Sequence, residues 1–266
     1  MRKIIFTLFI FLVLLFLYGK YIEPSKIKVK EYTIKDANVA KSFQELKFVQ
    51  ISDLLYNGNI KKLEKIKDIV NNLEPDIIFF TGDLFNKNIK YSDEDYKNIN
   101  NFLKSLNAEL YKYAIIGDND NNNLDKYKDI LYDSNFILLN NEKFLLFYKD
   151  NTPINIVGLN NNYNIDELLQ TDVEYNYSII LVHNPDEIKN LNNDKINLVL
   201  AGHSLGGIVN IPYYGGLIKK EGINTYINEY YKVNNKDLYI SNGLGYERFE
   251  FRLFNTPSIN VFRFSN

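Results

Sequence analysis

Apolar residues follow two different periods along the first half of the chain. Short apolar runs at 47–52, 76–81 and 113–116 predict buried strands. Between them, apolar residues at helical spacing predict helices over 60–73 and 92–106. The order strand, helix, strand, helix, strand is typical of parallel strands joined by crossover helices, so the sequence predicts an α/β layer.

The second half of the chain has a different pattern. Apolar runs at 136–140, 143–148 and 154–158 follow one another closely, which favours antiparallel pairing at or beyond the edge of the sheet. Further strands are predicted at 237–241 and 259–264. No internal repeat is present in the sequence, so one domain with two sheets is the simplest prediction.

Five apolar runs stop at a side chain that can bind a metal ion. In chain order these side chains are Asp53, Asp83, Asp118, His183 and His203. The carboxyl ends of strands in open α/β sheets form the edge where ligands bind. Carboxylate oxygens and imidazole nitrogens suit Mn²⁺, Fe or Zn²⁺. The pattern therefore predicts that these five residues are the ligands of one or two divalent metal ions.

The amino terminus carries an apolar run at 4–18, preceded by Arg2 and Lys3. A signal peptide and a signal anchor both remain open, because the run is shorter than the roughly 17–25 residues of a comfortable span. The flank from Gly19 to Pro24 has no small-x-small cleavage site, which favours an uncleaved anchor at residues 1–22. The positive residues then predict a cytoplasmic amino terminus and an extracytoplasmic domain; cleavage would give a secreted protein.

Composition narrows the function classes further. The 266 residues are 45% hydrophobic and can bury a large core, so residues 23–266 are predicted to form one domain. The net charge of −2 gives no basic field for nucleic acid, so no nucleic-acid partner is predicted. Cysteine is absent, which excludes disulfides, Cys-ligated zinc and a cysteine nucleophile.

The strand ends belong to five short motifs. They are Phe48-Val49-Gln50-Ile51-Ser52-Asp53, Thr81-Gly82-Asp83, Ile116-Gly117-Asp118-Asn119-Asp120, Leu181-Val182-His183-Asn184-Pro185 and Ala201-Gly202-His203-Ser204-Leu205-Gly206-Gly207. In this order they resemble the motifs of calcineurin-like metallophosphoesterases. The closer resemblance is to a membrane-anchored bacterial branch with small phosphodiesterases and UDP-diacylglucosamine pyrophosphatases. It implies an α/β (α+β) sandwich of two mixed β-sheets flanked by helices, a divalent metal cofactor and a phosphoester substrate, lipid-linked in part of that branch.

The chain departs from the family pattern at three positions where the family has histidine. These positions are Leu55, Asn119 and Leu205. The resemblance implies that the leucines replace ligands of the first metal ion, leaving Asp53 and Asp83 there. It also implies that the second site keeps a full set of candidates, namely Asp83, Asp118 in place of asparagine, His183 and His203. The losses therefore predict a reduced site that holds one ion.

Asn119 and Asp120 of the third motif are the predicted catalytic residues. The family's histidine at position 119 stabilises or protonates the leaving group, and an asparagine can still donate a hydrogen bond. Loss of a general acid costs roughly 10²–10⁴-fold in rate.

Three hypotheses from different classes follow. The first is a membrane-tethered metal-dependent phosphoesterase, a hydrolase that acts on phosphodiester or pyrophosphate bonds. The second is a catalytically inactive family member that binds a phosphorylated ligand or partner. The third is a structural surface protein that only retains the fold. Metal-dependent hydrolysis, ligand binding without product, and the absence of both distinguish the three.

Overall fold

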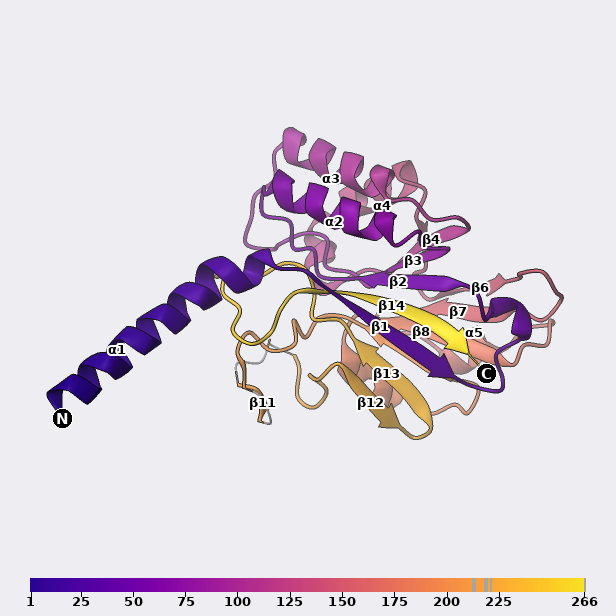
Figure 1. The fold of residues 1–266 in the computed structure, drawn as a ribbon. Coiled ribbons are helices and arrows are strands. Elements are labelled where there is room, and N and C mark those ends of the chain that lie inside the picture. Colours follow the sequence, from indigo (N-terminus) through magenta and orange to yellow (C-terminus); the bar gives the residue numbers. More distant parts are fainter. Residues whose placement is uncertain (212–213, 218–219, 221, 266) are drawn as a thin grey trace.

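The computed structural model describes residues 1–211, 214–217, 220 and 222–265. These residues form two six-stranded mixed sheets that pack face to face, with helices on the outer sides (Figure 1). The first sheet has the order β1-β14-β2-β3-β4-β5 and the second has the order β12-β13-β9-β8-β7-β6. The predicted sandwich of two mixed sheets flanked by helices is therefore confirmed.

The bounds of the elements are as follows. The first sheet contains β1 (Lys28–Lys35), β14 (Ser258–Ser265), β2 (Lys47–Ile51), β3 (Ile77–Phe80), β4 (Tyr111–Ala114) and β5 (Ile137–Leu138). The second contains β12 (Tyr230–Val233), β13 (Lys236–Ile240), β9 (Leu198–Ala201), β8 (Tyr177–Val182), β7 (Ile154–Gly158) and β6 (Glu142–Leu146). A small pair is formed by β10 (Asn210–Ile211) and β11 (Gly215–Gly216). The α-helices are α1 (Arg2–Leu17), α2 (Ile60–Asn72), α3 (Asp93–Ser105), α4 (Leu124–Asp133) and α5 (Ile165–Leu169).

The predicted parallel layer is present in the first half of the chain. Strands β2, β3 and β4 are parallel, with α2 and α3 as the crossovers between them. Helix α3 begins with a capping box, because Ser92 and Asp95 exchange side-chain to backbone hydrogen bonds. The carboxyl ends of these strands therefore lie at one edge of the sheet.

The prediction of antiparallel pairing after residue 136 is only partly right. Strands β6 and β7 are antiparallel, but β5 pairs parallel to β4. The reason is α4, a helix that was not predicted, which lies between β4 and β5 and supplies the long crossover that parallel pairing needs. Strands β7, β8, β9 and β13 are also parallel, so their carboxyl ends lie at one edge of the second sheet.

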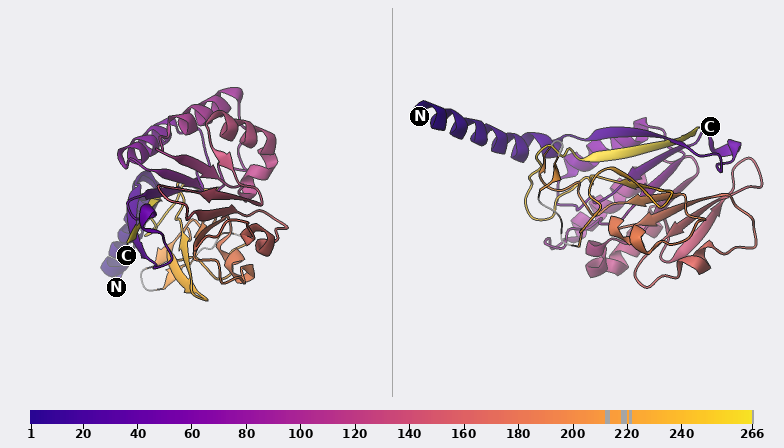
Figure 2. Two further views of the ribbon diagram at one scale, coloured as in Figure 1. Left: turned by 90° about the vertical axis from the view of Figure 1, so that its right-hand side faces the viewer. Right: turned by 90° about the horizontal axis from the view of Figure 1, so that it is seen from below.

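Apolar side chains fill three layers. Helices α2, α3 and α4 pack on the outer face of the first sheet (Figure 1). Ile66, Phe102 and Ile78 belong to the apolar cluster of this layer. The two sheets bury Phe79 and Leu200 between them. The left view of Figure 2 shows this layering from one end. The extensive buried core holds the two sheet edges in fixed relation.

A buried polar network joins the two sheets beneath the edge of carboxyl ends. The Gln50 side-chain amide on β2 donates to the Thr81 hydroxyl at 3.1 Å and to the Ala201 carbonyl at the end of β9 at 2.9 Å. Asn260 of β14 donates to the Gln50 side-chain oxygen at 3.0 Å. Buried amides with these partners fix one arrangement of the strands that carry them.

The amino-terminal helix projects away from the sandwich (Figures 1 and 2). Among the described residues, one helical stretch, Arg2–Ser25, is long and apolar enough to cross a membrane, and nearly all of it is exposed. Helix α1 continues without a break through a π-helical turn, Tyr18–Ile22, and a 3-10 turn, Glu23–Ser25. The predicted anchor segment is therefore a single projecting helix.

Candidate metal centre

The structure brings all five predicted metal ligands to the facing edges of the two sheets. Asp53 follows β2 and Asp83 follows β3, while Asp118 begins the 3-10 helix Asp118–Asn123 after β4. His183 and His203 follow β8 and β9 of the second sheet. All of them except Asp118 are buried, and the Asp118 side chain is 65% exposed. Their role as ligands stays a prediction, but the required convergence is present.

Three of these side chains surround one point, and Asp118 lies beside it. The His183 Nε2 atom lies 3.2 Å from Asp83 Oδ2 and 3.3 Å from His203 Nδ1. The His203 Nδ1 atom also lies 3.3 Å from Asp118 Oδ2. One ligand atom from each of Asp83, His183 and His203 falls within 4.8 Å of the others. One oxygen and two nitrogens thus face a common centre, and the Asp118 carboxylate adjoins it through His203.

Hydrogen bonds outside this centre orient the two imidazoles. The His183 Nδ1 atom lies 2.8 Å from the Thr81 carbonyl, which only accepts, so Nδ1 donates and Nε2 faces Asp83. The His203 backbone N–H donates to Asp53 Oδ2 at 2.9 Å. Burial, together with the positive charges of Lys220 and His183, lowers the pKa of His203 to about 4, so this ring stays neutral. His203 is therefore in the neutral form that binds metal ions, whereas Asp83 raises the pKa of His183 to about 10 against the opposing effect of burial.

Two glycines allow the loops that carry the predicted metal ligands to pack closely against one another. A Cβ atom at Gly117 would lie 2.1 Å from the Asp83 backbone nitrogen. A Cβ atom at Gly202 would lie 2.0 Å from Ser52 Oγ. Any larger residue at either position would force the motifs apart.

The loop backbones adopt left-handed conformations at the ends of the strands. Three predicted ligands have positive φ, with values of 49° at Asp53, 60° at Asp83 and 61° at His203. Leu55 and Leu205 have the same conformation, with φ of 44° and 49°. Such residues are held against a conformational cost, so the surrounding structure imposes the shape of these loops.

The two predicted catalytic residues occupy different environments. The Asn119 side-chain amide donates to Asp83 Oδ2 at 2.6 Å, and its backbone N–H donates to Asp83 Oδ1 at 2.8 Å. Asp120 instead accepts four backbone N–H groups, from Asp83, Leu84, Phe85 and Gly117. Asn119 therefore contacts the Asp83 carboxylate directly, whereas Asp120 holds the backbone of the Asp83 loop.

Sequence reasoning missed two charged residues of the site. Lys220 Nζ lies 2.8 Å from Asp83 Oδ2, 3.2 Å from Glu247 Oε1 and 3.8 Å from Asp53 Oδ1. Lys220 lies 137 residues after Asp83 and is in neither a helix nor a strand, so no strand-end pattern marks it. Burial alone would lower the pKa of the Lys220 ammonium, but Asp83, Asp53 and Glu247 together raise it above its usual value.

The donor atoms fit a divalent ion on only one side of Asp83. Asp83, Asp118, His183 and His203 offer the mixed oxygen and nitrogen set that Mn²⁺, Fe or Zn²⁺ accepts. The family resemblance implies four positions for the ligands of a first metal ion. In this chain they hold Asp53, Asp83 and the buried side chains of Leu55 and Leu205. With Lys220 in place these residues do not fit a tightly bound transition metal, because the leucines have no donor atom and both carboxylates already face an ammonium.

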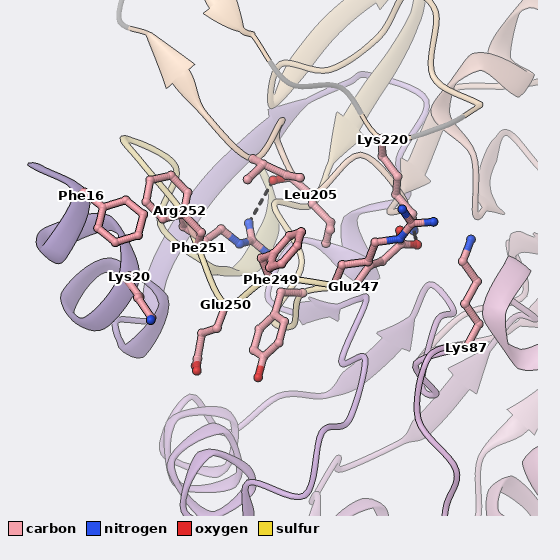
Figure 3. Close-up of a pocket in the computed structure, with 13 residues that line it drawn as sticks. Phe16, Lys20, Lys87, Leu205, Lys220, Glu247, Phe249, Glu250, Phe251 and Arg252 are labelled. Carbon is pink, nitrogen blue, oxygen red and sulfur yellow. Dashed lines mark hydrogen bonds and ion pairs between the residues drawn. The ribbon is translucent and has the colours of Figure 1, made fainter. Parts of the chain in front are cut away.

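An apolar pocket of about 640 Å³ leads away from this centre (Figure 3). Lys220 and Glu247 line one end of the pocket. Phe16 and Lys20 of the amino-terminal helix line the other end, and Phe249 lies between. The pocket thus connects the candidate metal centre with the projecting helix.

The projecting helix is docked onto the loop that forms this pocket. The Gly19 carbonyl accepts the Arg252 backbone N–H at 2.9 Å, and the Phe16 and Phe251 rings stack at 5.6 Å. The Glu23 carboxylate is buried and accepts the Phe254 backbone N–H at 2.8 Å. The segment after the helix is therefore a rigid joint and not a free linker.

The same loop is tied to the metal-centre motifs through Arg252. Its buried guanidinium donates to the carbonyls of Leu205 at 2.9 Å, Asn242 at 2.6 Å and Gly245 at 2.7 Å. Arg252 is thus a packing residue. It couples the helix joint to the motif that contains His203.

Carboxylates and imidazoles at the facing edges of two mixed sheets define a metal-dependent hydrolase of the metallophosphoesterase class. The chain belongs to the calcineurin-like phosphoesterase family, because that family's model matches residues 46–207, more than half of its length. This confirms the predicted family and the prediction of a phosphoesterase hydrolase. Members of the family use divalent metal ions.

Relatives of this chain carry related names. The metallophosphoesterase YkuE of Bacillus subtilis is 30% identical over 92% of this chain and 88% of its own length. The UDP-2,3-diacylglucosamine pyrophosphatase LpxG of Chlamydia muridarum is 28% identical over 94% of this chain and 93% of its own length. Among solved structures, the protein TT1561 of Thermus thermophilus has a TM-score of 0.47 and 14% identity, over 75% of this chain and 90% of that chain.

Proposed function

We propose that the protein is a membrane-tethered phosphoesterase that hydrolyses a pyrophosphate or phosphodiester bond of a lipid-linked substrate. The observation that carries the proposal is the apolar pocket between the docked helix and the metal centre. An acyl chain in this pocket would bring the attached phosphate to Lys220 and Asn119. The similarity to LpxG, whose name describes a pyrophosphatase of a diacylated sugar nucleotide, supports the same substrate class.

The membrane arrangement follows from the amino-terminal sequence. Arg2 and Lys3 precede the apolar helix, which supports a cytoplasmic amino terminus and an extracytoplasmic sandwich. We take the helix to be an uncleaved anchor, because Gly19 and Glu23 dock it onto the pocket loop. Cleavage before residue 23 would remove one wall of the pocket.

The proposed centre holds one divalent ion on Asp83, Asp118, His183 and His203. When bound, such an ion supplies Lewis acidity, which polarises a phosphoryl oxygen and promotes the ionisation of a water molecule. Asp83 is held ionised for this purpose: burial opposes ionisation, but His183 and Lys220 lower the pKa of its carboxyl well below the usual range. The Asn119 amide is positioned to donate a hydrogen bond beside Asp83.

Asn119 also limits the choice of substrate. An amide donates a hydrogen bond but does not transfer a proton, so position 119 supplies no general acid. A leaving group that is stable without protonation, such as a phosphate released from a pyrophosphate, is therefore favoured over an alkoxide. This chemistry favours pyrophosphate over alkyl phosphodiester hydrolysis.

The proposal is tested with the full chain in lipid–detergent micelles containing Mn²⁺. We expect hydrolysis of a diacylated sugar nucleotide pyrophosphate and a loss of about 10³-fold in kcat/KM for Asp83→Asn, because several kcal/mol of transition-state stabilisation disappear. Phe249→Ser should reduce kcat/KM for the lipid substrate by about tenfold but leave hydrolysis of a soluble aryl phosphodiester unchanged. Phe147→Ser, an exposed phenylalanine outside the pocket, is the matched control.

Two outcomes would contradict the proposal. Equal kcat/KM for lipid-linked and soluble substrates, unaffected by Phe249→Ser, would remove the lipid assignment. Binding of the lipid phosphate by a metal-loaded protein without product would favour the inactive, ligand-binding alternative.

A further inference from the structure

Lys220 is a buried cation in the centre of the site. Its side chain is 6% exposed, and its ammonium faces the carboxylates of Asp83, Glu247 and Asp53 at 2.8, 3.2 and 3.8 Å. Burying an ammonium ion costs several kcal/mol unless partners of opposite charge offset the loss of water. Three carboxylates within 4 Å provide such partners, so the lysine has a defined place in the site.

The ammonium lies between the carboxylates of Asp53 and Asp83. These are the two residues with donor atoms among the four positions that the family resemblance implies for the first metal ion. Asp53 Oδ2 accepts from Ser52 Oγ at 2.6 Å and from the His203 N–H, while Asp53 Oδ1 has no hydrogen-bond partner within the described residues. That oxygen points to the lysine at 3.8 Å. Two carboxylate oxygens therefore face Lys220 from opposite loops, as they would face a metal ion.

Apolar side chains complete this position. Leu55 and Leu205 are both buried, and they occupy the places where the family has histidine ligands. A divalent ion there would find only oxygens that already face an ammonium. The residues therefore disagree with a two-metal centre but agree with a fixed positive charge.

We propose that Lys220 replaces the first metal ion, so that its ammonium is a permanent part of the centre and only one divalent ion binds. The inference rests on the metal centre proposed above. Asp83 then links the ammonium to the proposed metal site. Its Oδ2 atom accepts a hydrogen bond from Lys220 and also lies 3.2 Å from His183 Nε2. The ammonium also lines the pocket, where it meets an incoming phosphate with positive charge.

The test is the metal stoichiometry of the full chain in detergent micelles, stripped with EDTA and titrated with Mn²⁺. Bound Mn²⁺ is measured by calorimetry and by elemental analysis after desalting. We expect one Mn²⁺ per wild-type chain and two in Lys220→Ala, where Asp53, Asp83 and Glu247 become available to a cation. Lys220→Arg should bind one, because the guanidinium keeps the charge. Lys87→Ala is the matched control, since Lys87 is an exposed lysine that lines the same pocket.

Thermal unfolding gives a second readout that does not depend on activity. Without metal, Lys220→Ala should unfold about 10 °C below the wild type, because unpaired buried carboxylates remain. Excess Mn²⁺ should raise its midpoint more than that of the wild type. Lys87→Ala should match the wild type in both conditions.

A double variant keeps the test decisive if Lys220→Ala does not fold. Asp53→Asn/Lys220→Met removes one negative charge together with the ammonium, so we expect it to fold and to bind one Mn²⁺. Two Mn²⁺ per wild-type chain, or no gain of Mn²⁺ in a folded Lys220→Ala, would overturn the role of Lys220. The absence of Mn²⁺ from the wild type would overturn the proposed metal centre itself, which is a different result.

Discussion

The two sides of Asp83 are built on the same kind of loop but carry different chemistry. On one side, His183, His203 and Asp118 offer nitrogen and oxygen donors. On the other side, Leu55 and Leu205 offer none, and Lys220 faces the carboxylates. Asp83 belongs to both sides. In the proposed centre, one side of the shared carboxylate therefore has metal-donor atoms and the other lacks them, although the loops on both sides have the same shape.

Backbone geometry explains how the loop shape persists. The left-handed conformation at Leu55 and Leu205 matches that at Asp53 and His203. It is held by contacts that do not involve the leucine side-chain chemistry, such as the bond from Arg252 to the Leu205 carbonyl. Packing around the loops, rather than metal binding, therefore fixes their form.

The largest effect is expected from a change on the side of Asp83 that carries His183, His203 and Asp118, which we call the metal side. His203→Ala removes a nitrogen donor, so we expect bound Mn²⁺ to fall from one per chain to none and kcat/KM to fall by about 10³-fold. Elemental analysis and steady-state kinetics measure the two quantities.

The matched control for that change lies on the opposite side of Asp83, the lysine side, which carries Leu55, Leu205 and Lys220. Leu205→Met conserves volume and apolar character and should leave Mn²⁺ content unchanged. Retention of Mn²⁺ by His203→Ala, or its loss in Leu205→Met, would contradict the assignment of Mn²⁺ binding to the metal side alone.

An intermediate effect is expected beneath the shared carboxylate. Asp120→Ala leaves four buried backbone N–H groups without their acceptor, so the free energy of unfolding should fall by at least about 3 kcal/mol. The corresponding fall in midpoint is about 6–12 °C. Asp129→Ala, at an exposed position of α4, should change the midpoint little. A small effect of Asp120→Ala would show that Asp83 is positioned by other contacts.

The smallest effect is expected at Asp118. Asp118→Asn keeps an oxygen donor but removes a charge that is 65% exposed, where one charge interaction is worth about 1 kcal/mol. The dissociation constant of Mn²⁺ should therefore rise by less than about tenfold in calorimetry. Complete loss of Mn²⁺ would mean that the Asp118 charge, and not only its oxygen, holds the ion.

Local signals in the sequence predicted the fold and the metal side. The capping box at Ser92 and the helical spacing after Ile60 depend on neighbours along the chain, and both helices form as expected. The five ligand candidates were visible because each ends an apolar run, and parallel strands bring such ends together.

The lysine side was not visible for a physical reason. Lys220 is 137 residues away from Asp83 in the sequence, and tertiary packing rather than a repeat or a strand end brings the two together. Glu247 joins them from a third segment of the chain. Helix α4 was missed although Tyr127, Ile130 and Leu131 have helical spacing, because the asparagine run before it is typical of a loop.

The docked helix joint has a consequence for how substrate is found. Gly19 and Glu23 fix the helix to the pocket loop, so under the proposed anchoring the sandwich sits at a set height above one face of the bilayer. Protein and lipid-linked substrate then move in the same two-dimensional fluid. Their rate of encounter is governed by molecules per unit area of membrane, not by molarity in the surrounding water, and molecules in the opposite leaflet are out of reach.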